Sequence, residues 1–525
     1  MSSNNDLLIQ ENNSLKKEVQ TLADEVSLLK NTIKHLIDSK YGRKSEKINH
    51  GDDFERGLFD SENIETKEHP EKFSGDDFIV IEEHKRLKKG RRRIPKEMPC
   101  RDNIQKLSDE ETVCEKCNKK MTFIGYEESS ELDFIQAIIE HVKNKREKWV
   151  CKNKDCECNQ EDGKPNIKVA PPVPKIVPKS VLSNNFLAYI ATSKFEDANP
   201  FYRLEKMTSR YGFSVPRSTM CSLIIKAAFN MDAFMNLLWD KLLESHFLGI
   251  DETHVQVIEQ IDKPPGSKSY MWVFRGGTKA NPIVFFRFSP SRSSELISRL
   301  LESYQGKIQS DGYNVYSSYA ASRGLMHYCC WSHARREFYK IVKISKNHEG
   351  ANYVLKRIRE LYQIEKYGKK ENLSPEDLSL YRIEKALTIL EDLNVYLEEK
   401  KTMVPEGTDF GKAINYTLSR WNELKSYVND GHIPIDNNLV ENAIRPFVVG
   451  RKNWMFNYNE NGAYASAVFY TIIETSKANG LEPYSYMCFL FNELPKLPVE
   501  RYNELLPMNV DRSKVKSYSI PPRYR

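Results

Sequence analysis

The N-terminal part of the chain places an apolar residue at every seventh position. Leucine recurs at this spacing, and the position four residues after each of the first four leucines holds asparagine, valine, valine and isoleucine in turn. The residues of this repeat are Leu8, Asn12, Leu15, Val19, Leu22, Val26, Leu29, Ile33 and Leu36. Leucine at one core position of a heptad, with β-branched residues and one asparagine at the other, favours a parallel two-stranded coiled coil. We therefore predict a dimer through residues 8–36; the alternative is one amphipathic helix packed against its own chain.

Residues 181–245 have the apolar spacing of helices throughout. Within them, a helix, a turn at Tyr211-Gly212-Phe213 and a second helix starting near Pro216 have the spacing of a helix-turn-helix. This element would place Arg217 at the start of the second helix, where it is a candidate DNA contact. Helical hairpins without any DNA contact share the same pattern.

From His246 the pattern changes to short apolar runs separated by turns rich in Gly, Pro and Asn, which predict strands. The order to about residue 344 is β-β-β-α-β-α-β-α. About ninety residues of charged, helical sequence follow before the last helical motif, "DNNLVENAIRPFVVGRKNWMF" (Asp436–Phe456). The fold class is therefore a multidomain α+β protein with an α/β domain interrupted by a helical insertion.

Charge is uneven along the chain, although the formal net charge is only +6. Residues 48–84 are polar and acidic, as in a flexible linker. The next stretch, "KRLKKGRRRIPK" (Lys85–Lys96), carries eight basic residues among twelve, which is typical of a solvated tail or of a nucleic-acid contact. Its candidate DNA contacts are Lys88, Lys89, Arg91, Arg92 and Arg93.

The ten cysteines are better candidates for metal ligands than for disulfides. No apolar run approaches a membrane span and the N-terminus lacks a signal-peptide pattern, so we expect a cytoplasmic protein, in which disulfides are rare. Cys114 and Cys117 form a C-x-x-C pair, and Cys151, Cys156 and Cys158 follow a strand-like stretch. Two thiolate pairs suit one tetrahedral structural Zn²⁺. We assign Cys114, Cys117, Cys151 and Cys156, with Cys158 as the alternative fourth ligand and ordinary reduced cysteines as the competing interpretation.

Three acidic residues are the candidate catalytic and metal-binding residues. Asp251 in "LGIDET" and Asp311 in "IQSDGY" fall near strand ends, and Glu441 lies on the late helix. A carboxylate is unfavourable in a buried strand, so an acid there suggests a function. Carboxylates gathered at one sheet end repel each other unless cations neutralise them, and hard oxygen ligands suit Mg²⁺ or Mn²⁺. Two such ions can catalyse displacement at a phosphodiester. The basic and aromatic residues that would hold the phosphates are Arg445, Arg451, Lys452 and Trp454.

These motifs resemble bacterial transposases of the insertion-sequence-66 family, which are DDE enzymes with a ribonuclease H-like catalytic domain. The matching segments are "DET", "SDGY", "NNLVENAIRP" and "CCWSHARREF", and the resemblance extends over nearly the whole chain. It implies DNA cleavage and strand transfer at terminal inverted repeats, with Asp251, Asp311 and Glu441 holding two Mg²⁺ or Mn²⁺ ions. It also implies DNA contacts from His333, Arg335 and Arg336.

The resemblance bears on two further points. Some DDE enzymes carry a C-x-x-H signature, matched here by Cys330 and His333; we favour packing or a DNA contact over zinc for this pair. Insertion sequences of this family commonly encode two small accessory proteins, which are candidate partners beside DNA and a second copy of the chain. Within a bacterial cell such a protein would associate with the nucleoid.

The predicted organisation is a coiled coil (1–47), a linker (48–84), a basic segment with a zinc module (85–175), a helical region (176–245), the first part of the catalytic domain (246–344), a helical insertion (345–430), the last part of the catalytic domain (431–480) and a C-terminal segment (481–525).

Two other functions fit part of the pattern. One is a catalytically silent DNA-binding protein, which the intact acids disfavour. The other is a ribonuclease H-fold nuclease without strand transfer, which the zinc module and the dimerising N-terminus disfavour.

Overall fold

The computed structural model describes residues 139–151, 167–260, 263–264 and 267–518, together with the backbone of two strands within 78–87 and a few single residues between 112 and 126. The predicted coiled coil therefore lies outside the described residues. So do the predicted DNA contacts of the basic segment and the predicted zinc ligands Cys114, Cys117 and Cys156, with the alternative Cys158.

The chain divides into two compact units, residues 37–135 and the remainder. In the smaller unit β1 (Phe78–Ile81), within the segment predicted as a linker, pairs antiparallel with β2 (His84–Leu87). In the larger unit β3 (Lys148–Val150) pairs antiparallel with β4 (Ile167–Val169). Cys151 follows β3 directly and is partly buried.

Among the described residues, four helices precede the central sheet, in the region that the sequence predicts to be helical. They are α3 (Asn184–Phe195), α4 (Phe201–Arg210), α5 (Arg217–Phe229) and α6 (Asp232–Leu243). The turn between α4 and α5 contains Gly212 at a φ of +96°, a left-handed conformation that favours glycine. Leu204 of α4 and Met220 of α5 are buried in the shared core.

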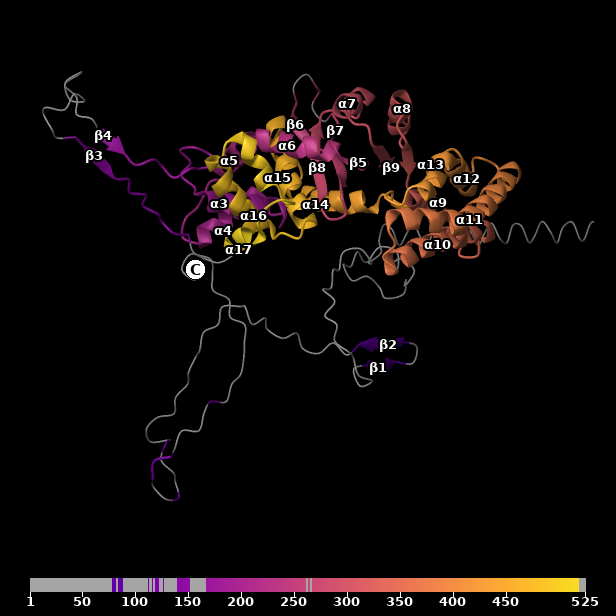
Figure 1. The fold of residues 1–525 in the computed structure, drawn as a ribbon, viewed down its shortest axis with the longest axis horizontal. Coiled ribbons are helices and arrows are strands. Elements are labelled where there is room, and N and C mark those ends of the chain that lie inside the picture. The colour runs from indigo at the N-terminus through magenta and orange to yellow at the C-terminus, as the bar shows by residue number, and fades with distance from the viewer. Residues whose placement is uncertain are drawn as a thin grey trace, which may run out of the picture. The chain divides into compact units, whose positions relative to one another are not determined.

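The central sheet has five strands in the order β10-β9-β5-β7-β8. Its strands are β5 (Phe247–Val255), β7 (Ser269–Gly277), β8 (Pro282–Ser289), β9 (Lys307–Ser310) and β10 (His327–Cys329). The first three pair antiparallel, whereas β9 runs parallel to β5 and β10 parallel to β9. The prediction of a mixed α/β protein is thus confirmed (Figure 1).

The helices between the strands and the helix of the late motif come in the predicted order, whereas the helices after residue 459 were not individually predicted. They are α7 (Ser294–Leu300), α8 (Asn314–Arg323), α9 (Trp331–Ile344), α14 (Asn438–Trp454), α15 (Glu460–Ala478), α16 (Pro483–Glu493) and α17 (Arg512–Ser517). Helix α15 protects the edge strand β8, because Thr471 and Thr475 turn their hydroxyls to its backbone. Their oxygens accept hydrogen bonds from Phe286 N–H (2.8 Å) and Val284 N–H (3.2 Å), donors that an exposed edge would leave open to another chain.

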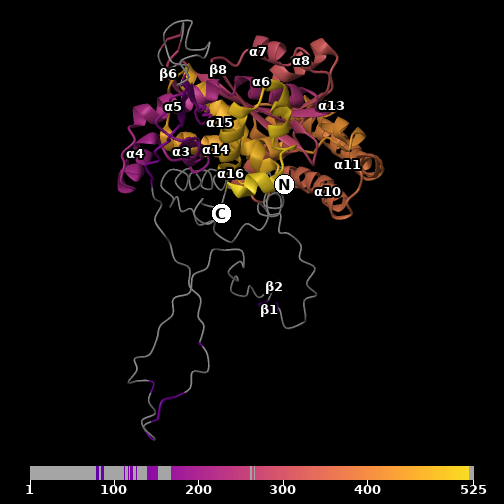
Figure 2. The same ribbon diagram turned by 60° about the vertical axis from the view of Figure 1, so that its left-hand side comes forward.

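Residues 349–429 form a helical group beside the sheet (Figures 1 and 2). Its elements are α10 (Glu349–Lys370), α11 (Pro375–Met403), α12 (Asp409–Leu418), α13 (Trp421–Lys425) and the short 3₁₀ helix η3 (Ser426–Asn429). The group has its own apolar core, which includes Leu361, Leu390 and Ile414 and continues into α9 through Trp331 and Phe338. It is thus packed onto α9 and β10 rather than onto the antiparallel half of the sheet.

The described residues contain no single helix that is both long enough and apolar enough to cross a membrane; the bent pair α5–α6 meets these criteria by length and composition only.

Candidate active site

Asp251 lies on β5, the central strand, and faces α14. Two residues earlier on the same face, a Cβ added to Gly249 would meet Val440 Cγ2 of α14 at 2.4 Å and Asn437 Oδ1 at 3.0 Å. Because side chains alternate along a strand, Asp251 projects toward this side as well. Its Oδ1 accepts the N–H of Glu252 at 2.8 Å.

Asp311 follows β9 directly, and the parallel pairing of β9 with β5 places it near Asp251. Its Oδ1 accepts the N–H of Tyr313 at 3.0 Å. Gly312 between them has a φ of +88°, which turns the chain sharply at this point. The loop therefore holds the second acid in a defined orientation.

Two side chains of the helical group 349–429 anchor this loop. The hydroxyl of Tyr416 donates to the carbonyl oxygen of Asp311 at 2.8 Å. Arg420 donates from Nε and Nη2 to the carbonyl oxygen of Gly312 at 3.1 and 3.0 Å, and its guanidinium stacks on the Tyr416 ring. Sequence reasoning did not find these two residues, because nothing local in the insertion relates them to a loop more than a hundred positions earlier.

Glu441 lies in the first turn of α14, and the segment before this helix is fixed to three other elements. Asn437 donates from Nδ2 to the carbonyl of Ile250 on β5 at 3.2 Å and from its backbone N–H to Cys330 Sγ at 3.1 Å. Asp436, which is buried, accepts Tyr362 of α10 at 2.8 Å. Cys330 and Asp436 therefore help to fix the start of α14, the packing role favoured for Cys330.

The carboxylates around Asp251 affect its protonation. Burial, together with repulsion from the carboxylates of Glu252, Asp311 and Glu441, raises the pKa of Asp251 to about 7, against the opposing hydrogen bond from the Glu252 amide. Like charges gathered in this way favour protonation or cation binding.

One carboxylate oxygen of Glu441 is placed to coordinate a cation. Its Oε1 is buried and has no hydrogen-bond partner, although His333 Nδ1 lies 3.5 Å away, and its Oε2 pairs with Arg336 Nη2 at 3.3 Å. The acidic donor set and this oxygen fit a hard divalent cation.

Glu252, the neighbouring acid, is engaged on the opposite face of β5. It pairs with Arg292 and accepts a hydrogen bond from the Tyr316 hydroxyl of α8. Arg292 in turn stacks 3.6 Å from the ring centroid of Tyr313, next to the Asp311 loop. Glu252 is therefore bound into the protein on the side away from α14, as strand alternation predicts.

The candidate DNA contacts occupy different environments. Arg217, Arg336, Arg445 and Lys452 are exposed, and His333 is partly buried beside Glu441. Burial lowers the pKa of His333 despite the nearby Glu441 carboxylate. Arg451 is partly buried and donates to Thr253 Oγ1 on β5 at 3.2 Å.

Two of the candidate DNA contacts need correction. Trp454 is only 8% exposed and packs edge-on against Phe447 with ring centroids 5.6 Å apart. Arg335 is 6% exposed and lies 5.3 Å from the ring centroid of Tyr339. Trp454 belongs to the apolar core and Arg335 is buried beside Tyr339, so neither offers an exposed surface to a duplex.

Comparison with family models identifies the family of the chain. A model of the Transposase IS66 family matches residues 179–465, and a model of the IS66 C-terminal element matches residues 471–508. The chain belongs to the IS66 transposase family. The family match begins just before α3 and includes β5, β9, the helical group 349–429 and α14, and therefore all three acids.

Relatives of this family member occur in Sinorhizobium fredii (strain NBRC 101917 / NGR234). The uncharacterized protein y4qI is 26% identical over 518 residues, covering 94% of this chain and 91% of the relative. The uncharacterized protein y4jD is 28% identical over 437 residues, covering 79% and 81%. The similarity to y4qI therefore spans nearly the whole length of both chains.

Proposed function

We propose that the protein is a DDE transposase that binds the terminal inverted repeats of its insertion sequence and catalyses metal-dependent DNA cleavage and strand transfer. The observation that carries this proposal is the convergence of Asp251, Asp311 and Glu441 from β5, the end of β9 and α14. The strand order supports it, because three antiparallel strands followed by two parallel ones are what a ribonuclease H-like domain requires. We further propose that α10–α13 are an insertion into this domain.

Asp251, Asp311 and Glu441 would hold Mg²⁺ or Mn²⁺, two ions per site. When bound, such ions activate an attacking oxygen and stabilise the leaving oxygen of a phosphodiester. The chain's own residues contribute position and charge: Tyr416 and Arg420 fix the Asp311 loop, and Arg336 beside Glu441 offers a cation to a DNA phosphate.

The remaining elements of the proposal concern assembly on DNA. The exposed Arg217, Arg445 and Lys452 would contact phosphates, together with the basic segment at 85–96. One structural Zn²⁺ at the cysteine module and a dimer through residues 8–36 would help to pair two DNA ends. Two accessory proteins of the same element are candidate partners.

The first test is cleavage of a labelled duplex that carries the element's terminal repeat, in Mg²⁺, Mn²⁺ or EDTA. The wild type should nick the repeat end in either metal. Glu441→Gln should lose cleavage while binding the duplex in a gel-shift assay. Glu384→Gln, an acid whose side chain is 66% exposed on α11, is the matched control and should cleave normally.

Two outcomes would change the proposal. Normal cleavage by Glu441→Gln would remove this residue from the metal site. Binding without cleavage by any of the proteins, even after the element's neighbouring gene products are added, would favour the alternative of a DNA-binding protein without catalysis.

A further inference from the structure

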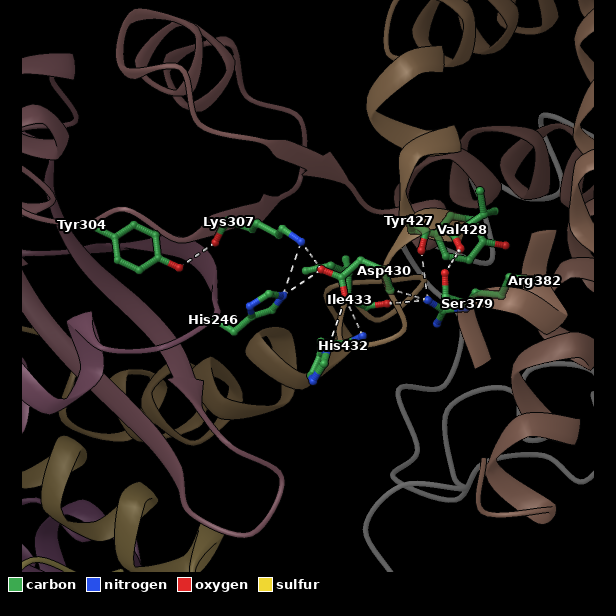
Figure 3. A network of polar contacts seen from close by, with 10 residues as sticks. All are labelled: His246, Tyr304, Lys307, Ser379, Arg382, Tyr427, Val428, Asp430, His432 and Ile433. Atoms are coloured by element: carbon green, nitrogen blue, oxygen red, sulfur yellow. Dashed lines mark hydrogen bonds and ion pairs between the residues drawn. The ribbon is translucent and has the colours of Figure 1, made fainter. Parts of the chain in front are cut away.

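A second group of possible metal ligands lies outside the three-acid site (Figure 3). His246 immediately precedes β5, whereas Asp430 and His432 lie on the loop between η3 and α14. His246 Nε2 is 2.8 Å from Asp430 Oδ2, and His432 Nδ1 is 3.2 Å from Asp430 Oδ1. Both imidazoles thus face one carboxylate, although 184 positions separate His246 from Asp430.

The spacing of the three donor atoms is near that of a metal centre. One nitrogen from each histidine and one Asp430 oxygen all lie within 4.8 Å of one another. Ligands about 2.0–2.1 Å from a tetrahedral Zn²⁺ stand about 3.3 Å apart. Small side-chain rotations would therefore bring these three atoms around one ion.

The loop that carries Asp430 and His432 is fixed by a buried arginine of α11. Arg382 of α11, only 1% exposed, donates from Nη1 to the carbonyl oxygens of Asp430 (2.8 Å) and Ile433 (3.1 Å). Its Nε and Nη2 donate to both oxygens of the Glu365 carboxylate at 2.8 and 2.6 Å. A backbone fixed in this way lowers the cost of ordering ligands.

The site is open to solvent and already holds a cationic group. The side chains of His246 and His432 are 49% and 48% exposed, so an ion can reach them. The ammonium of Lys307, the first residue of β9, contacts Asp430 and lies 3.4 Å from His246 Nε2. Lys307 therefore occupies the position of a competing cation.

We propose that His246, Asp430 and His432 bind one transition-metal ion of the Zn²⁺ class, with solvent completing the coordination. Two imidazole nitrogens and one carboxylate oxygen favour Zn²⁺, Co²⁺ or Ni²⁺ over Mg²⁺. The ion displaces the Lys307 ammonium and ties the start of the catalytic sheet to the loop that leaves the helical insertion. This proposal is independent of the cleavage activity.

The test is titration of the full-length protein with Co²⁺ in excess Mg²⁺, followed by visible and near-ultraviolet absorption. Thiolate ligation at the cysteine module gives sulfur charge-transfer bands, whereas nitrogen and oxygen ligands give visible d–d bands without them. We expect the wild type to bind one equivalent of Co²⁺ that gives visible d–d bands without sulfur charge-transfer bands. His432→Asn should lose that equivalent, and Lys307→Met should bind it more tightly because the competing charge is gone.

Thermal unfolding checks that the variants are folded, and His246→Asn, on a different element, repeats the loss should His432→Asn fail to fold. Equal stoichiometry and identical d–d bands in the wild type and in the folded histidine variants would overturn the proposal. The cluster would then be a hydrogen-bond network only. Weaker or unchanged Co²⁺ binding by Lys307→Met would overturn the proposed displacement of the Lys307 ammonium by the ion.

Discussion

Arg382 should be among the most costly residues to remove from the helical group 349–429. Its guanidinium is buried and donates five hydrogen bonds, two to the Glu365 carboxylate and one each to the carbonyl oxygens of Tyr427, Asp430 and Ile433. Arg382→Met keeps most of the apolar stem but removes all five. It leaves Glu365, 17% exposed, without its counter-ion.

The expected loss follows from these contacts. Breaking a buried ion pair by removing one partner costs about 3–5 kcal/mol. The carbonyl oxygens of Tyr427 and Asp430 still accept the backbone N–H groups of Asp430 and Ile433, so only the Ile433 carbonyl loses its donor, which adds about 1 kcal/mol. Because Glu365 is partly exposed, we expect a total near the lower end, about 4 kcal/mol. For a cooperative unit of 150–250 residues this lowers the melting temperature by on the order of 10 °C.

Differential scanning calorimetry measures this loss, and tryptophan fluorescence follows it in part, because Trp331 and Trp421 pack in the apolar core that the helical group shares with α9. Lys385→Met removes a half-exposed cation from the same helix and should change stability by less than about 1 kcal/mol. A similarly small loss in Arg382→Met would refute the reasoning. So would an Arg382→Met/Glu365→Leu double variant that loses the full sum of the single losses, since the double variant no longer contains an unpaired buried charge.

Two further predictions concern the Asp311 loop and pH. Tyr416→Phe removes the hydrogen bond to the Asp311 carbonyl, which is worth about 0.5–1.5 kcal/mol. It should slow DNA cleavage roughly 2- to 10-fold with unchanged duplex binding. A cleavage rate equal to that of the exposed control Tyr367→Phe would show that this hydrogen bond does not contribute to catalysis. Burial raises the pKa of Glu474 from 4.5 to about 7, so the folded protein holds the proton of this carboxyl group more tightly than the unfolded chain does. The stability that this proton contributes is fully present below pH 4.5 and is lost as the pH rises through 7. Glu474→Gln should therefore be more stable than wild type at pH 8, by up to about 3 kcal/mol, and equal slopes of unfolding free energy against pH in the two proteins would contradict this.

Local patterns in the sequence predicted most of the order of elements from residue 181 to α9, although they merged the short strand β6 (Val257–Glu259) with β5. They placed Asp251 near a strand end, whereas it lies in the middle of β5; Asp311 follows β9 and Glu441 lies on α14, as expected. Each strand is a short apolar run between turn residues, and each helix repeats its apolar positions at helical spacing, so the signal lies within a few neighbouring residues. The motifs around Asp251, Asp311 and Glu441 are similarly short. The family match confirms the membership that these motifs predicted.

Packing between distant segments accounts for what the sequence did not reveal. The anchoring of the Asp311 loop by Tyr416 and Arg420, and the meeting of His246 with Asp430, join segments separated by more than a hundred residues. Trp454 has the residue type of a DNA contact but lies in the core, because α14 turns that face inward. Periodicity reports which residues share a face of one element, whereas the partner of that face depends on how all the elements pack together.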